Sequence, residues 1–133
     1  MMGYLPQFTS LGKLELIEVY EFYDEPILFS CRNASDAIFM AVFADEGDDF
    51  ETWLYVGVSR RRFERIRSGA IDLHDAFSEA EDGIVFQIQI PYDESAQAPI
   101  IPIPSGAIDK DMLPLPGEFI KLECAKPVKV GGI

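Results

Sequence analysis

The 133-residue sequence predicts an α+β fold, with an antiparallel sheet of about five strands and two short helices between the fourth and fifth strands. Residues 13–58 contain strand-like segments separated by short turns, which is typical of an antiparallel meander. Residues 59–83 contain two helical segments with capping residues, and residues 84–90 return to strict alternation. We therefore expect one core domain over 13–90, preceded by a lead-in at 1–12.

The first two strands are predicted at 13–23 and 27–31, joined by a turn at 24–26. Glutamates recur every three residues in 13–23, as on a helix face, but its β-branched and aromatic content favours a strand. Its alternation slips between Leu16 and Ile17, which indicates a bulge.

The third strand is predicted at 37–44, which is apolar on both faces and therefore central and covered. An acidic turn at 45–49 leads to the fourth strand, 50–58. Alternate residues of the fourth strand face opposite sides, with Phe50, Thr52, Leu54 and Val56 on one side and Glu51, Trp53 and Tyr55 on the other.

Two short helices follow. Ser59 is a suitable N-cap for a helix over 60–67, which Ser68 and Gly69 end. Asp72 caps the second helix. The apolar residues expected to face inward are Phe63 and Ile66 in the first helix, and Leu73, Ala76 and Phe77 in the second.

The fifth strand, 84–90, alternates throughout. Its isoleucines and phenylalanine should face the core, and its other residues should face outward. The inward set is Ile84, Phe86, Ile88 and Ile90, and the outward set is Val85, Gln87 and Gln89.

Residues 91–133 form a proline-rich extension with a candidate edge strand at 119–124. Prolines exclude an ordinary helix or a central strand over 91–117. This part of the chain either wraps the surface in an extended conformation or hangs free of it. Its isoleucines require a cover, which either this fold or a partner subunit supplies.

Charge is distributed unevenly along the chain. Segment 60–67 contains five arginines and Glu64, a local charge of +4, so the rest of the chain must sum to −16 to reach the formal −12. Arginine forks suit carboxylate and phosphate groups. We expect contact residues at Arg60, Arg61, Arg65 and Arg67, with apolar anchors at Trp53 and Tyr55. On a helix, Arg61 and Arg65 share one face and Arg60 and Arg67 another.

Two other interpretations of the charges stay open. The arginines could belong to a solvated helix that balances nearby acids, and the net charge disfavours a nucleic acid partner. The acidic runs 15–25, 45–51 and 72–82 each carry −5. They either keep the protein in solution or, if they converge, imitate a phosphate backbone.

No catalytic, metal or cofactor motif is evident. His74 is the single histidine, and we interpret it as a helix-surface residue. The acidic turn lacks the pattern of a calcium loop. The chain has no serine elbow, phosphate-binding glycine loop or paired-cysteine motif. Cys31 and Cys124 are expected to be reduced, unreactive thiols. We therefore predict a protein that is not an enzyme.

The start of the chain has no basic region followed by an apolar stretch. The longest apolar run, 37–44, is far shorter than the roughly 20 residues that span a bilayer. We therefore expect a cytoplasmic protein that does not enter a membrane.

Three segments resemble a known family: EVYEFYDEPILF at 18–29, WLYVGVS at 53–59 and IRSGAIDL at 66–73. They are similar to uncharacterised bacterial domains of unknown function. The resemblance covers residues 13–90 and leaves out the proline-rich part. It implies a bacterial origin and a shared fold, and no activity.

The sequence thus predicts a protein–protein interaction module that acts as an accessory or inhibitory subunit of a bacterial intracellular assembly. Its partner is a protein of unknown identity or a second copy of the chain. The alternative is a role related to nucleic acid, either through the 60–67 arginines or by acidic mimicry.

Overall fold

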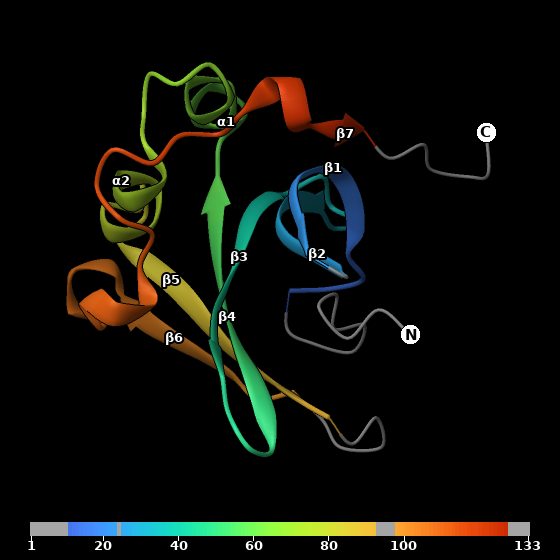
Figure 1. Ribbon diagram of the computed structural model, residues 1–133, viewed down its shortest axis with the longest axis vertical. Helices are drawn as coiled ribbons and strands as arrows, with labels where there is room; N and C mark the ends of the chain where they lie inside the picture. The colour runs from blue at the N-terminus through green and yellow to red at the C-terminus, as the bar shows by residue number, and fades with distance from the viewer. Residues whose placement is uncertain (1–10, 24, 93–97, 128–133) are drawn as a thin grey trace.

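The computed structural model describes residues 11–23, 25–92 and 98–127. Its strands form one antiparallel sheet in the order β6-β5-β4-β3-β2-β1-β7 (Figure 1). The strands are β1 (Glu15–Tyr23), β2 (Glu25–Arg32), β3 (Ile38–Glu46), β4 (Phe50–Val58), β5 (Ile84–Pro91), β6 (Ile100–Pro104) and the two-residue β7 (Lys126–Pro127). The predicted α+β class is confirmed.

Helices α1 (Arg60–Arg67) and α2 (Leu73–Ser78) lie between β4 and β5, as predicted. Three 3-10 turns follow β6, at Ser105–Ala107 (η1), Lys110–Met112 (η2) and Leu122–Cys124 (η3). The sheet has six strands apart from β7, rather than about five, because part of the proline-rich segment pairs with β5 as β6.

Strands β1 to β6 pair in chain order, so the predicted meander of the first four strands is confirmed, and β5 and β6 continue it. The register between β1 and β2 shifts between Leu16 and Glu18, which confirms the predicted bulge. Two further shifts follow before the end of β1. Bulges increase local twist, and β1 lies at the strongly curved side of the sheet in Figure 1.

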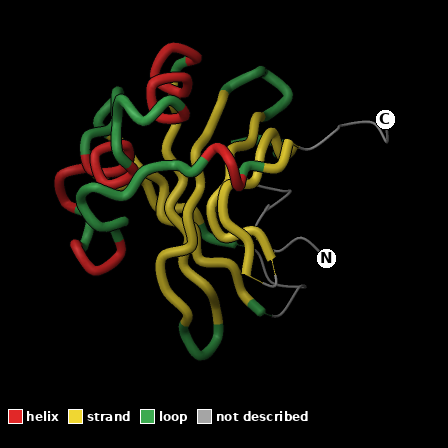
Figure 2. Tube along the Cα trace, turned by 45° about the horizontal axis from the view of Figure 1, so that its top comes forward, coloured by secondary structure: helices red, strands yellow, loops and turns green. Residues whose placement is uncertain are grey.

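Both faces of the sheet carry buried apolar residues. On the helix-side face, α1, α2 and the chain from η1 to η3 pack over the sheet (Figure 2). On the opposite face, the Phe29 ring lies 5.6 Å from that of Trp53 and 6.0 Å from that of Tyr55. Leu11 and Leu14 complete this second cluster.

Because both faces of the sheet are covered, the prediction for the inward and outward residues of β5 is wrong in part. Val85 was expected to face outward, but it is fully buried in the helix-side cluster. Ile84, expected in the core, is 38% exposed. The alternation itself is real, because Ile88 and Ile90 belong to the opposite cluster. The prediction erred by assuming that only one face of the strand is covered.

Residues 105–125, which we call the strap, cross the helix-side face (Figure 1). Ile108 and Ile120 of the strap are buried in the helix-side cluster. The predicted edge strand at 119–124 is wrong: this stretch ends in η3, and the short edge strand is β7. Ile120 enters the core between the exposed residues Phe119 and Lys121, so the alternation reflects packing of the strap rather than a strand.

Candidate functional site

Helix α1 has the bounds and caps that the sequence predicts. The Ser59 hydroxyl accepts a hydrogen bond from the Arg62 amide at 3.1 Å and donates one to Glu81 at 2.9 Å. At the other end, the Ala70 amide donates to the Arg65 carbonyl at 2.9 Å, and Gly69 has a φ of +84°. Glycine adopts this left-handed conformation readily, which ends the helix.

The inner face of α1 consists of Phe63 and Ile66, which are 5% and 0% exposed. Both pack in the helix-side cluster, as predicted. This packing orients the five arginines, because their directions around the helix axis follow from which residues face inward. Arg62 and Arg67 lie on the two flanks of the inner face. The other three arginines point away from it toward solvent.

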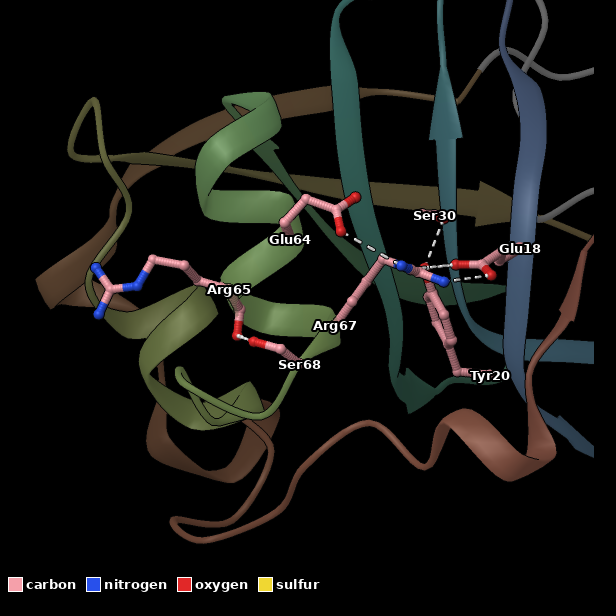
Figure 3. Close-up of polar contacts among 7 residues, drawn as sticks. All are labelled: Glu18, Tyr20, Ser30, Glu64, Arg65, Arg67 and Ser68. Carbon is pink, nitrogen blue, oxygen red and sulfur yellow. Dashed lines mark hydrogen bonds and ion pairs between the residues drawn. The ribbon is translucent and has the colours of Figure 1, made fainter.

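Arg67 lies on the flank that faces β1, where it binds Glu18 through two hydrogen bonds. Its Nε atom is 2.7 Å from Glu18 Oε1, and its Nη2 atom is 2.9 Å from Oε2 (Figure 3). These side chains are only 28% and 12% exposed. The Tyr20 hydroxyl also donates to Glu18 at 2.8 Å.

The hydrogen bonds from Arg67 hold the pKa of Glu18 below its usual range, so this carboxylate stays ionised at neutral pH. Arg67 was expected to contact a partner. Its guanidinium instead joins α1 to β1. The Nε and Nη2 groups, which would bind a carboxylate of a partner, already bind Glu18.

Arg62 lies on the other flank and reaches α2. Its Nη2 atom donates to the carbonyls of Glu79 at 2.6 Å and Asp75 at 3.2 Å. These carbonyls are at the end of α2, where a cation is favourable. The sequence prediction assigned Arg62 no role. The local sequence has no signal for it, because the position of α2 beside α1 is a tertiary property.

The remaining arginines, Arg60, Arg61 and Arg65, are exposed. None has a side-chain hydrogen bond or ion pair with any residue that the structure describes. Figure 3 shows Arg65 pointing away from the Arg67–Glu18 pair. We call these three residues the arginine face, in which Arg61 and Arg65 share one side of α1 and Arg60 lies at its start on another side. It is the candidate site, and its three residues are among the predicted contact residues.

Trp53 and Tyr55, the predicted apolar anchors, are both 0% exposed. They lie in the core of the opposite face, so in this fold they cannot contact a partner. Sequence reasoning missed Phe119, which is 46% exposed and lies beside Gly69 at the end of α1. Its place beside α1 depends on the course of the strap, for which the sequence has no local signal.

The acidic runs lie on three separate parts of the structure: β1 and the start of β2, the β3–β4 hairpin, and α2 with the residues after it. In Figure 1 the hairpin projects to the bottom of the molecule, whereas α2 lies at the upper left. Glu18 faces Arg67 rather than solvent. The described residues of these runs therefore do not form one continuous acidic surface.

His74 and Cys31, which the sequence offered as candidate reactive residues, each have a structural environment in the fold. His74 Nδ1 lies 3.0 Å from the Pro114 carbonyl, so it donates a hydrogen bond that joins α2 to the strap. Cys31 is buried, and burial raises the pKa of its thiol, as expected for an unreactive cysteine. The Cys124 side chain lies outside the described residues. Within the described ranges, no three histidine, cysteine or acidic side chains are placed to hold a metal ion.

These features define a small α+β domain whose helices present an arginine face beside a strap. The chain belongs to a family of unknown function, DUF6575, whose model matches residues 2–127. The match extends well beyond 13–90 and includes the proline-rich part, which the sequence resemblance left out. No curated protein and no solved structure matches the chain. None of the helices in the described part of the chain is long and apolar enough to cross a bilayer.

Proposed function

We propose that this protein is a non-enzymatic protein–protein interaction module, an accessory or inhibitory subunit of a bacterial cytoplasmic assembly. Its contact surface is the arginine face of α1. The partner presents carboxylates to Arg61 and Arg65, which lie one helical turn apart.

The observation that carries this proposal is that three arginines form no side-chain hydrogen bond or ion pair with the described residues, in a chain of net charge −12. The same helix uses Arg62 and Arg67 for internal contacts, so internal acceptors are within reach of α1. Arg60, Arg61 and Arg65 lack such contacts with the described residues and are available to a partner. Arginine is well suited to interfaces because its planar fork binds carboxylates in fixed geometry.

The arrangement favours a protein partner over nucleic acid. A phosphate backbone would meet three arginines on a molecule that is otherwise strongly acidic, and phosphate contacts supply most of the affinity for nucleic acid. Mimicry of nucleic acid needs a continuous acidic surface, whereas the acidic runs lie on separate elements.

The test is affinity capture from a lysate of the source organism, with and without nuclease, read by mass spectrometry. Arg61→Glu with Arg65→Glu should abolish capture of the partner, because both carboxylate contacts become repulsive. The matched control is Lys13→Glu with Arg32→Glu, which changes net charge by the same −4 at two exposed residues outside α1. The control should retain the partner.

Capture that survives the double arginine variant would refute the arginine face as the contact surface. Loss of every partner on nuclease treatment would favour nucleic acid. Circular dichroism of each variant checks that the fold is intact, which we expect because none of the four side chains has a described partner.

A further inference from the structure

A groove of about 220 Å³ opens on the helix-side face, between the strap and strands β2 and β3. Its apolar lining includes Leu28, Val42 and Leu113, and its acidic lining consists of Glu21, Asp111 and Glu118. All three carboxylate residues are exposed, and none forms an ion pair with a described residue. Among the described residues that line the groove, none is a lysine or arginine.

The size and chemistry of the groove fit one long cationic side chain. Small-molecule sites usually measure roughly 300–1,000 Å³, which is larger than this groove. An arginine can place its aliphatic stem on an apolar floor and its guanidinium among carboxylates at the rim. The groove is therefore complementary to the residues of the arginine face.

The strap links the groove to the end of α1, the helix that carries the arginine face. The Glu118 carbonyl, at the groove, accepts a hydrogen bond of 2.7 Å from the Leu73 amide at the start of α2. The next residue, Phe119, lies beside Gly69, the second residue after the helix that carries Arg65. This part of the strap carries two exposed apolar side chains: Phe119 and Leu115 are 46% and 68% exposed, and the Glu118 amide donates to the Leu115 carbonyl at 3.2 Å.

We propose that the groove, the strap at 115–119 and the arginine face form one surface, which pairs with the same surface of a second copy of the chain. In a two-fold symmetric dimer, Arg65 of each copy enters the groove of the other, and Leu115 and Phe119 pack near the axis. A two-fold interface must be complementary to itself, and a surface with a cationic part, an apolar part and an acidic part in succession meets that condition. This inference rests on the proposed function and names the partner of the arginine face.

Long-range repulsion opposes the dimer, because each copy carries −12. Salt at about 0.15 M screens charges more than about 8 Å apart, while closer and partly buried pairs are screened less. The dimer should therefore be more stable near physiological salt than at very low salt.

The experiment is sedimentation velocity of the full chain at about 1–100 μM and about 0.15 M salt, with charge-reversal variants. Arg65→Glu alone and Glu118→Lys alone should each raise the dimer Kd by about tenfold or more. Glu118→Lys changes the net charge from −12 to −10, so general repulsion cannot explain its weaker dimer. The matched controls are Arg32→Glu and Asp48→Lys, at exposed residues outside α1, the strap and the groove lining, and they should dimerise like the unaltered chain.

The decisive arm mixes the two single variants. In the mixed dimer, one contact keeps both natural charges and the other has both charges reversed, so both contacts are attractive. We expect the mixture to form a heterodimer that neither variant forms with itself, detected by native mass spectrometry.

An unaltered chain that stays monomeric over the whole concentration range would overturn the dimer. A dimer whose Kd is unchanged by Arg65→Glu would overturn the groove contact. So would a mixture of the two single variants that forms no heterodimer. A monomeric chain that still captures another protein through Arg61 and Arg65 would refute the dimer and leave the proposed function standing. Capture that does not depend on those arginines would refute the proposed function itself.

Discussion

Arg62 and Arg67 flank the inner face of α1, and each binds a different neighbour. Arg67 joins the helix to β1 through Glu18, and Arg62 joins it to the carbonyls that end α2. Three residues of the same type, Arg60, Arg61 and Arg65, make no such contact with the described chain. The direction in which each arginine leaves the helix therefore decides its role. Those that point toward neighbouring elements hold the fold together, and those that point toward solvent are available to a partner.

At this scale we predict that Arg62→Ala lowers the free energy of unfolding by about 1–2 kcal/mol, because two carbonyls lose a charged donor. The buried Arg62 Nε atom has no hydrogen-bond partner among the described residues, and this costs part of the stability that the Nη2 hydrogen bonds contribute. We therefore expect the loss on Arg62→Ala to fall at the lower end of that range. Urea denaturation measures the change. Arg60→Ala, on an exposed side chain, should change stability by less than about 0.5 kcal/mol, and equal effects would contradict the structural role of Arg62.

Helix α2 has only six residues, and contacts with other elements hold it in place. The carboxylate of its N-cap, Asp72, accepts hydrogen bonds from the Asp75 amide at 2.8 Å and the Gly117 amide at 2.9 Å. Asp72 therefore caps the helix and fastens the strap. His74 adds a second link, to the Pro114 carbonyl. A helix this short is marginal by itself, so the strap and α1 decide whether it forms.

We predict that Asp72→Ala destabilises the protein by about 1–2 kcal/mol at neutral pH. The two amide hydrogen bonds hold the pKa of Asp72 below its usual value. A lowered pKa stabilises the fold above the unfolded-state pKa, about 3.9, and this contribution is lost as the pH falls through the folded-state pKa. The difference between the native chain and the variant should therefore be constant from about pH 5 to 7 and shrink below about pH 4.

Chemical denaturation at both ends of that pH range tests the prediction. A difference that grows in acid would show that the carboxylate is not stabilised by these hydrogen bonds. Asp48→Ala is a suitable control, because Asp48 is exposed and its carboxylate has no described hydrogen bond.

Over the whole molecule, the sheet is covered on both faces and its β6 edge is modified by prolines. Pro102 and Pro104 pair in register with Phe86 and Ile84 of β5. Neighbouring residues of a strand direct their N–H groups to opposite sides, so donors toward β5 come from Ile101 and Ile103. The prolines then fall on the outer side, where their missing N–H groups discourage another strand from adding to the sheet.

The strap is part of the same core as the sheet and helices, since Ile120 is 8% exposed in the helix-side cluster. We predict that Ile120→Ala lowers the free energy of unfolding by about 2–4 kcal/mol, as for other buried isoleucines. The neighbouring exposed residue serves as the control: Lys121→Ala should have an effect below about 0.5 kcal/mol. A single cooperative thermal transition that shifts as a whole in Ile120→Ala would show that the strap unfolds together with the sheet and helices. A small change in the free energy of unfolding would mean that the strap adds little to the core.

The elements that the sequence predicted well depend on short-range signals. Ser59, Gly69 and Asp72 each act on backbone groups within a few residues, so the bounds of α1 and the start of α2 follow from the local sequence. Alternation in 50–58 likewise predicted β4 and the division of its side chains between two faces. The class of fold followed from the order of these local elements.

Only the tertiary structure decided which predicted site residues are accessible. Arg67 is bound by Glu18, which is 49 residues away in the chain, and Trp53 and Tyr55 are buried on a face that the sequence did not show to be covered. The strap brings Phe119 and Glu118 beside the ends of α1 and α2. Local propensity and periodicity determine where helices and strands begin and end, because those forces act between near neighbours. Burial and pairing of long side chains depend on distant segments meeting, and only the folded chain brings them together.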